Sequence, residues 1–187
     1  MKLVCIGDSN TWGYDPRSII GGRYDLKKRW TGILKGNGYE VINLGVNGMC
    51  VPDEWDADGL IKVIKREADT DLLIVMLGTN DILQNCTAED TAKRMNAFLA
   101  RLKNETELPV LLLCPPVVQA GEWVSGPEVV RESQRLAGLY RIIAEQNDCR
   151  FADTSEWDIE TGFDGVHFTE TGHSSFAKGI LNVLEAE

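Results

Sequence analysis

Residues 71–77 read DLLIVML, and residues 109–114 read PVLLLC. Both runs are almost continuous in Leu, Ile and Val, which is typical of strands buried on both faces of a parallel sheet. Shorter apolar runs of the same kind stand at residues 2–6, 40–44 and 148–152. The sequence therefore predicts five strands.

Helical periodicity fills the segments between these strands. It occurs in residues 25–35, 53–67, about 87–103, 127–146 and about 170–185, and Thr87 and Asp90 have the spacing of a capping box. Strands that alternate with helices indicate an α/β fold with a parallel sheet. The residues expected to face the core are Leu26, Trp30, Ile33 and Leu34 in the first helix, Trp55, Leu60, Ile61 and Ile64 in the second, Ala92, Met95, Phe98, Leu99 and Leu102 in the third, and Val130, Leu136, Leu139, Ile142 and Ile143 in the fourth.

The composition limits the classes of protein to which the chain can belong. The 187 residues are 43% hydrophobic and 26% charged, which predicts one soluble domain over residues 1–187. A formal net charge of −10 argues against nucleic-acid partners and anionic membranes. Five cysteines without C-x-x-C spacing predict reduced thiols and a cytoplasmic protein. The apolar run at residues 3–6 is too short for a signal peptide, and the oligomeric state, a homo-oligomer included, is left open.

Polar residues follow the predicted strands at their carboxyl ends, where open parallel sheets form their sites. Gly7–Asn10 follows the first strand, Gly45–Gly48 the second and Gly78–Asp81 the third. Asp164–His167 lies beyond the fifth strand. We expect these segments to meet at one edge of the sheet.

Three of these residues can form a nucleophilic site. Activating a serine at neutral pH usually requires a neighbouring imidazole, and His167 follows Asp164 by three residues. Asp164 could accept the Nδ1 proton of His167, which leaves Nε2 to face Ser9. Taken singly, Asp164 could equally mark an ordinary turn, and Ser9 an ordinary helix N-cap.

Two further residues could bind a developing oxyanion. A backbone N–H can approach a substrate closely at Gly45, and the Asn80 amide is a neutral donor. Each also has a purely structural interpretation, a strand-to-loop turn at Gly45 and an Asx-turn at Asn80. The combination of serine, glycine, asparagine and histidine in this order is far more specific than any one of them.

With these four segments the chain resembles the SGNH hydrolases, also called the GDSL-type esterases and lipases. Gly7–Asn10 is similar to their first block, with Asn10 where many members carry leucine, Gly45 to the second, Gly78–Asp81 to the third and Asp164–His167 to the last. The resemblance covers nearly the whole chain. It is greatest to the arylesterase branch, on the segments GDSNTWG (7–13), RWTG (29–32), MLGTND (76–81) and DGVHFTE (164–170).

The resemblance implies a three-layer, flavodoxin-like fold and hydrolysis of a small-molecule ester through an acyl-enzyme, with no cofactor and no metal. It implies Ser9 as nucleophile, His167 as base and Asp164 as its partner. It also implies oxyanion donors from the Ser9 N–H, the Gly45 N–H and the Asn80 side chain. The expected substrates are short-chain carboxylic esters, acetyl or aryl.

Several weaker expectations concern the surroundings of the site. Asn10, Trp12, Asn47 and Trp123 are candidates for the substrate pocket, with Trp123 in a loop over residues 115–126. Trp12 could instead pack against the first helix. His173 is expected to be a solvated residue of the last helix.

Other functions use the same residues differently. A thioesterase, a lysophospholipase or a carbohydrate acetylesterase would keep the same catalytic machinery. A flavodoxin-like binding module is disfavoured because the sequence has no glycine-rich phosphate loop. An α/β-hydrolase is disfavoured because G-x-S-x-G is missing, the segment GHSSF at 172–176 being a near miss.

Overall fold

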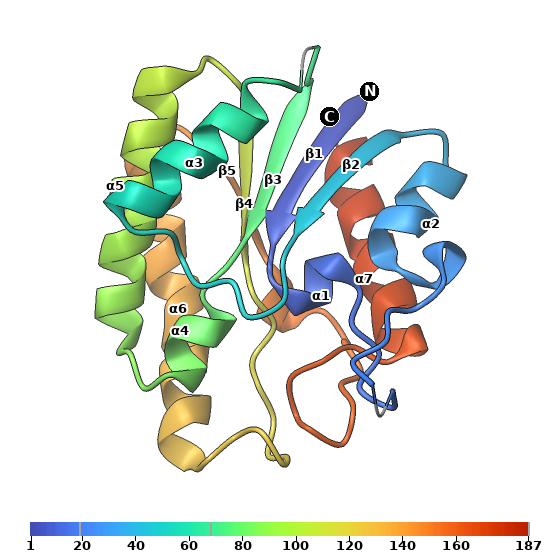
Figure 1. The fold of residues 1–187 in the computed structure, drawn as a ribbon. Helices are drawn as coiled ribbons and strands as arrows, with labels where there is room; N and C mark the ends of the chain where they lie inside the picture. The colour runs from blue at the N-terminus through green and yellow to red at the C-terminus, as the bar shows by residue number, and fades with distance from the viewer. Residues whose placement is uncertain (19, 68, 187) are drawn as a thin grey trace.

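The computed structural model describes residues 1–18, 20–67 and 69–186. Its centre is an all-parallel sheet of five strands in the order β2-β1-β3-β4-β5 (Figure 1). The strands begin and end within two residues of the predicted runs, and the α/β fold class is confirmed. They are β1 (Lys2–Gly7), β2 (Glu40–Gly45), β3 (Leu72–Met76), β4 (Val110–Cys114) and β5 (Arg150–Asp153).

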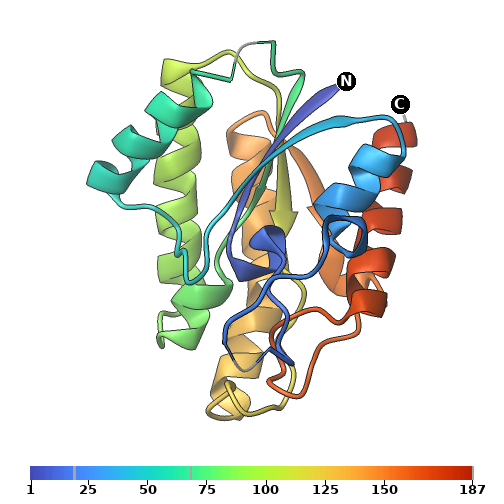
Figure 2. The ribbon, with the colours of Figure 1, turned by 45° about the vertical axis from the view of Figure 1, so that its right-hand side comes forward.

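Helices cover both faces of the sheet and make the fold three-layered (Figures 1 and 2). One face carries α3 (Glu54–Ile64), α5 (Ala88–Glu105) and α6 (Pro127–Gln146), and the other carries α2 (Trp30–Gly36) and α7 (Glu170–Glu185). Successive side chains of a strand point to opposite faces, so Leu73 and Val75 of β3 pack in one core and Ile74 and Met76 in the other. This explains the continuous apolar runs.

The strand order determines where the polar segments that follow the strands come together. The chain passes from β1 outward to β2 and then back across β1 to β3, so the topology reverses beside β1. Gly7 at the end of β1 is in register with Gly45 of β2 and Met76 of β3. The segments that follow these three strands therefore emerge side by side at the topological switch point.

The first predicted helix is two elements. Residues Leu26–Lys28 form a 3-10 turn, η1, and Arg29 is extended before α2 begins at Trp30. Gly32 packs so closely on this turn that a Cβ there would lie 1.7 Å from the Leu26 carbonyl oxygen. Only a glycine at position 32 therefore allows this close packing on the turn, and Leu26 is 48% exposed rather than in the core.

Two predicted core residues are on the wrong face of their helices. The buried residues of α3 are Ala57, Ile61 and Ile64, and Trp55 is 85% exposed. Trp55 precedes Ala57 by two residues, which is about 200° around the helix. Ile142 of α6 is 52% exposed for the same kind of reason, because its neighbour Ile143 faces the core.

Short helices begin at the carboxyl ends of β1 and β3. They are α1 (Ser9–Trp12) and α4 (Thr79–Leu83), and a 3-10 turn, η2 (Thr154–Glu156), follows β5. The N-cap of α5 is confirmed at Thr87, since Thr87 Oγ1 accepts the Asp90 N–H at 3.1 Å. The Asp90 carboxylate accepts the Thr87 hydroxyl at 2.8 Å, where a capping box would have it accept the Thr87 N–H. Among the residues described, no helix has the length and apolar character that crossing a bilayer requires.

Candidate active site

Ser9 is the first residue of α1, directly beyond β1. The N-cap is Asp8, whose Oδ1 accepts the Asn10 N–H at 2.9 Å and so fixes the start of this single turn. The first N–H groups of a helix have no intrahelical acceptor and lie at the positive end of its dipole. The Ser9 side chain is 6% exposed and sits in a setting that favours negative charge.

His167 and Asp164 lie beside this serine. His167 Nε2 is 2.9 Å from Ser9 Oγ, and His167 Nδ1 is 2.7 Å from Asp164 Oδ2. Asp164 Oδ1 accepts the backbone N–H groups of Val166 and His167, both at 2.9 Å. The aspartate therefore fixes both the orientation of the imidazole and the turn that carries it.

Burial and hydrogen bonding compete at the two carboxylates of the site. Burial raises the pKa of Asp164, but hydrogen bonds from the His167 ring and from two backbone N–H groups outweigh it, so the pKa lies below its ordinary value. Burial raises the pKa of Asp8 to about 6, against the lowering effects of the Asn10 N–H, His167 and Thr79. Asp164 is thus the ionised partner of the imidazole near neutral pH.

Asn10 braces the histidine segment and is not a residue of the pocket rim. Its side chain is 3% exposed, its Nδ2 donates to the Val166 carbonyl at 3.1 Å, and its Oδ1 accepts the Phe168 N–H at 2.9 Å. These two bonds straddle His167. They connect the nucleophile segment to the base segment across more than 150 residues.

The N–H of Gly45 is already engaged, which disagrees with its expected role as an oxyanion donor. It donates to Asn43 Oδ1 at 2.9 Å. A Cβ at Gly45 would lie 2.3 Å from the Trp12 backbone nitrogen, so the glycine serves the close packing of α1 on β2. Sequence reasoning could not see this, because the N–H is occupied by a side chain two residues earlier.

Gly48 is a candidate oxyanion donor that the sequence pattern did not single out. It lies in the β2–α3 loop, which we define as residues 46–53, and has φ = +75°. A Cβ at Gly48 would have no neighbour within 4 Å. Among the described residues, no backbone carbonyl accepts the Gly48 N–H. A second glycine three residues after Gly45 was the available signal.

Asn80, the second residue of α4, is joined to the same loop. Its Nδ2 donates to the Met49 carbonyl at 3.0 Å. One amide proton is thereby used and the other is left for a further acceptor. The neighbouring Thr79 interacts with Asp8, so the start of α4 lies against the start of α1.

Aromatic rings surround the imidazole. The Tyr14 ring centroid is 4.4 Å from that of His167, and the Trp123 centroid is 4.8 Å away with its ring edge-on. The structure thus brings Trp123 to the site, together with Tyr14, which the sequence did not single out. A hollow of about 310 Å³ beside them is lined by Tyr14, Pro16, Arg17, Ser18, Glu122, Trp123, Phe163 and Asp164.

Trp12 lies in α1 with Ser9, and Asn47 lies beside Gly48 on the β2–α3 loop. The Trp12 ring stacks under the Arg23 guanidinium, 4.9 Å from its centroid, and Asn47 is exposed on the β2–α3 loop. His173 is fully buried and not solvated, because α2 and η1 pack on that part of α7 and bring the Tyr24 ring edge-on to it. Burial lowers the pKa of His173 to about 3.

A parallel three-layer α/β fold with serine and histidine hydrogen-bonded at its switch point, and with asparagine and glycine on the neighbouring segments, is the arrangement of the SGNH class of hydrolases. A family model of the GDSL-like lipase/acylhydrolase family matches residues 5–174. The chain belongs to this family.

Solved structures agree with this assignment over almost the whole chain. A carbohydrate acetylesterase family member from Sinorhizobium meliloti is 30% identical with a TM-score of 0.84, covering 99% of this chain and 97% of that one. The aryl esterase of M. smegmatis is 25% identical with a TM-score of 0.87, covering 99% and 98%. A comparison with curated protein sequences gives no match.

Proposed function

We propose that this protein is a serine esterase that hydrolyses short-chain carboxylic esters, acetyl or aryl, through an acyl-enzyme on Ser9. The observation that carries the proposal is the unbroken hydrogen-bonded series from Ser9 through His167 to Asp164, with distances of 2.9 and 2.7 Å. The family and the esterases among its structural neighbours support it.

In the first step His167 Nε2 accepts the Ser9 hydroxyl proton while Oγ attacks the ester carbonyl. Asp164 holds the Nδ1 proton and stabilises the imidazolium that forms. His167 then gives the proton to the leaving alkoxide, and the acyl group remains on Ser9. A water molecule, deprotonated by the same imidazole, releases the carboxylic acid.

The charge that develops on the carbonyl oxygen needs donors on the side opposite His167. We propose the N–H groups of Ser9 and Gly48 and the Asn80 amide for this role, with Gly48 in place of Gly45 because the Gly45 N–H is bound to Asn43. Neutral donors fixed before the reaction stabilise such charge without reorganising.

A carbohydrate acetylesterase is the second candidate. It is favoured by the Sinorhizobium meliloti neighbour and by the hollow beside His167, where Tyr14 and Trp123 offer apolar ring faces and Arg17 and Glu122 offer polar groups. Because His167 protonates the leaving group, a hollow on this side would hold the alcohol part of the ester. A sugar and an aryl ring both fit this description.

The test combines labelling with turnover. A fluorophosphonate probe should label wild type at Ser9, and Ser9→Ala should abolish labelling and lower hydrolysis of p-nitrophenyl acetate by several orders of magnitude. Ser174→Ala, which removes an exposed serine on α7, is the matched control and should behave as wild type. Turnover by purified Ser9→Ala at the wild-type rate would disprove the mechanism, and acetylated sugars assayed in parallel separate the two candidates.

A further inference from the structure

Two side chains form hydrogen bonds with the backbone of Val51, near the end of the β2–α3 loop, one with its N–H and one with its carbonyl. Asp81 Oδ2 accepts the Val51 N–H at 2.9 Å, and Arg94 Nη2 donates to the Val51 carbonyl at 3.0 Å. Arg94 Nη1 donates to the other carboxylate oxygen, Asp81 Oδ1, at 2.9 Å. The three groups thus close a ring of hydrogen bonds.

Two of the three groups in the ring are buried. Asp81 and Val51 are fully buried, and the Arg94 side chain is 39% exposed. Burial raises the pKa of Asp81, and the Val51 N–H and the Arg94 charge act against it. Removing the guanidinium would leave a buried carboxylate that favours its proton and a carbonyl without this partner.

This ring lies within a few residues of both of the proposed oxyanion donors outside α1. Asp81 follows Asn80 in α4, and Val51 is three residues beyond Gly48. Between them, the Asn80 amide donates to the Met49 carbonyl. The exposed part of the loop, residues 46–48, is a turn that is fixed at one end by the Val46 N–H, which donates to the Gly7 carbonyl at 3.0 Å, and closed by the Met49 N–H, which donates to the Val46 carbonyl at 3.1 Å. The position of its other end depends on how residues 49–51 are held.

We propose that Arg94, on helix α5, is a positioning residue for the oxyanion donors, acting through Asp81 and Val51 on the β2–α3 loop. The inference rests on the proposed esterase function. A guanidinium fork suits this task, because it bonds a carboxylate and a carbonyl at once in a fixed plane, which an ammonium does not. Displacing catalytic groups by about 1 Å can cost about 100-fold in rate.

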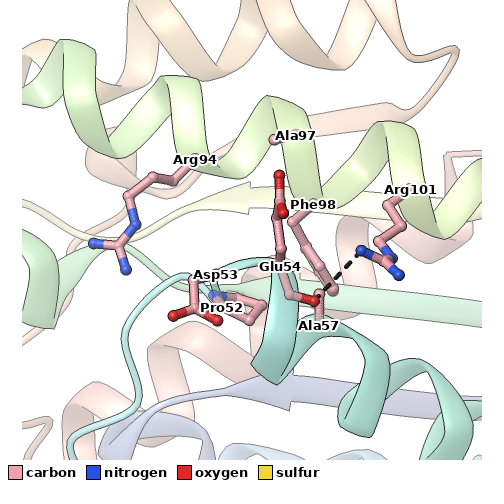
Figure 3. Close-up of a pocket in the computed structure, with 8 residues that line it drawn as sticks. All are labelled: Pro52, Asp53, Glu54, Ala57, Arg94, Ala97, Phe98 and Arg101. Atoms are coloured by element: carbon pink, nitrogen blue, oxygen red, sulfur yellow. Dashed lines mark hydrogen bonds between the residues drawn. The ribbon is translucent and has the colours of Figure 1, made fainter.

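The same helix offers a matched control. Arg94 and Arg101 both project from α5 beside a cavity of about 210 Å³ between α3 and α5 (Figure 3). Arg101 pairs with Asp58 and donates to the Glu54 carbonyl at 3.4 Å, so its partners belong to α3 and not to the loop. We therefore expect replacement of Arg101 to weaken the α3–α5 contact and to leave the hydrogen bonds of Val51 in place.

The experiment measures kcat and KM for p-nitrophenyl acetate in Arg94→Lys, Arg94→Ala and Arg101→Ala. Arg94→Lys keeps a positive charge beside Asp81, so it should fold, yet its kcat should fall about tenfold with KM nearly unchanged. Arg94→Ala should fall further, and Arg101→Ala should keep the wild-type kcat. Thermal melts of each variant separate loss of folding from loss of positioning.

A double-mutant cycle with Asn80→Ala provides the decisive test. If Arg94 acts through the loop that holds the Asn80 amide, the rate losses of Arg94→Lys and Asn80→Ala combine to clearly less than their product. Wild-type kcat in Arg94→Lys, or losses that multiply in full, would overturn the proposal. Failure of Ser9 labelling in wild type would instead overturn the esterase function itself.

Discussion

At the scale of single residues, the position of the Asn80 amide leads to a prediction for kcat. Its amide donates one proton to the Met49 carbonyl, and we propose that the other serves the developing oxyanion. Asn80→Ala should lower kcat by about 10²–10³ and leave KM nearly unchanged, because the donor acts mainly where charge develops. Steady-state kinetics check this, with Asn37→Ala at the exposed end of α2 as the control. A change confined to KM would make Asn80 a ground-state binding residue.

Asn10 acts on the base indirectly, through its hydrogen bonds to the backbone on either side of His167. Asn10→Leu would bury the Val166 carbonyl and the Phe168 N–H without their present partners, at a cost of about 1–3 kcal/mol for each group. We expect a lower free energy of unfolding and a lower kcat, because His167 lies between the two released groups. Urea unfolding and kinetics test both effects. Wild-type kinetics in Asn10→Leu would show that Asp164 alone orients the imidazole.

At the scale of elements, the loop before α6 is fitted to the segment that carries Asp164. The Gln119 N–H donates to Gly165 O at 2.8 Å and the Trp123 N–H to Asp164 O at 3.1 Å. A Cβ at Gly121 would lie 2.3 Å from the Asp164 carbonyl carbon, whereas one at Gly126 would meet nothing within 4 Å.

Gly121→Ala should therefore push the loop away from Asp164 and displace the Trp123 ring from His167. We expect a fall in kcat and a rise in KM for aryl esters, while Gly126→Ala should stay close to wild type. Kinetics on p-nitrophenyl acetate distinguish the two variants, and the part of the tryptophan fluorescence that Trp123→Phe removes reports the loop in each background. Equal behaviour of both alanine variants would refute this account of the close approach.

The sequence predicted the strands well because both faces of each central strand are buried, and an apolar run records that directly. Helix faces were predicted less well, since Trp55 and Ile142 fit the apolar period locally while the core lies on a neighbouring face. A helix start at Ser9 was predicted and is found there, with Asp8 and not Ser9 as the N-cap. The single turn α4 was not predicted, because a helix of five residues is set by its surroundings and not by propensity.

The same distinction applies to the candidate site. Ser9, Asp164 and His167 could be placed together because parallel strands bring their carboxyl ends to one edge. The engagement of Gly45 and the bracing role of Asn10 depend on hydrogen bonds whose partners no periodicity records. Burial of His173 likewise depends on how α2 packs across α7.

At the scale of the whole molecule, the space left for the acyl chain bears on substrate size. The hollow of about 310 Å³ lined by Tyr14 and Trp123 is assigned to the alcohol part of the ester, so we expect the acyl chain to lie along the exposed residues 46–48 of the β2–α3 loop without being buried. Each further methylene would contribute about 0.8 kcal/mol only if it were buried. We expect kcat/KM to be highest for p-nitrophenyl acetate and to fall through butyrate, octanoate and palmitate. A maximum at octanoate or longer would favour a thioesterase or lysophospholipase.

The stability of the whole fold should depend on pH through His173. This imidazole is buried among Tyr24, Phe168 and the Trp30 N–H, with Arg29, Asp15 and His167 as the charged or titratable groups that act on it. Its pKa is about 3 in the folded protein against an ordinary value of 6.5. Between these values the unfolded chain binds more protons than the folded one, so stability is present above about pH 6.5 and is lost as the pH falls.

The expected loss from this one group is about 3 kcal/mol between about pH 7 and about pH 4, at 1.36 kcal/mol for each pKa unit. His173→Gln keeps an acceptor for the Trp30 N–H but cannot take up a proton in this range. Urea unfolding of both proteins at a series of pH values should therefore give curves that converge as the pH falls, with wild type the steeper. The pairs Asp164–His167 and Arg94–Asp81 are common to both proteins and cancel in the difference. Parallel curves would mean that His173 takes up its proton equally in the folded and the unfolded chain. In that case burial would not hold the imidazole neutral.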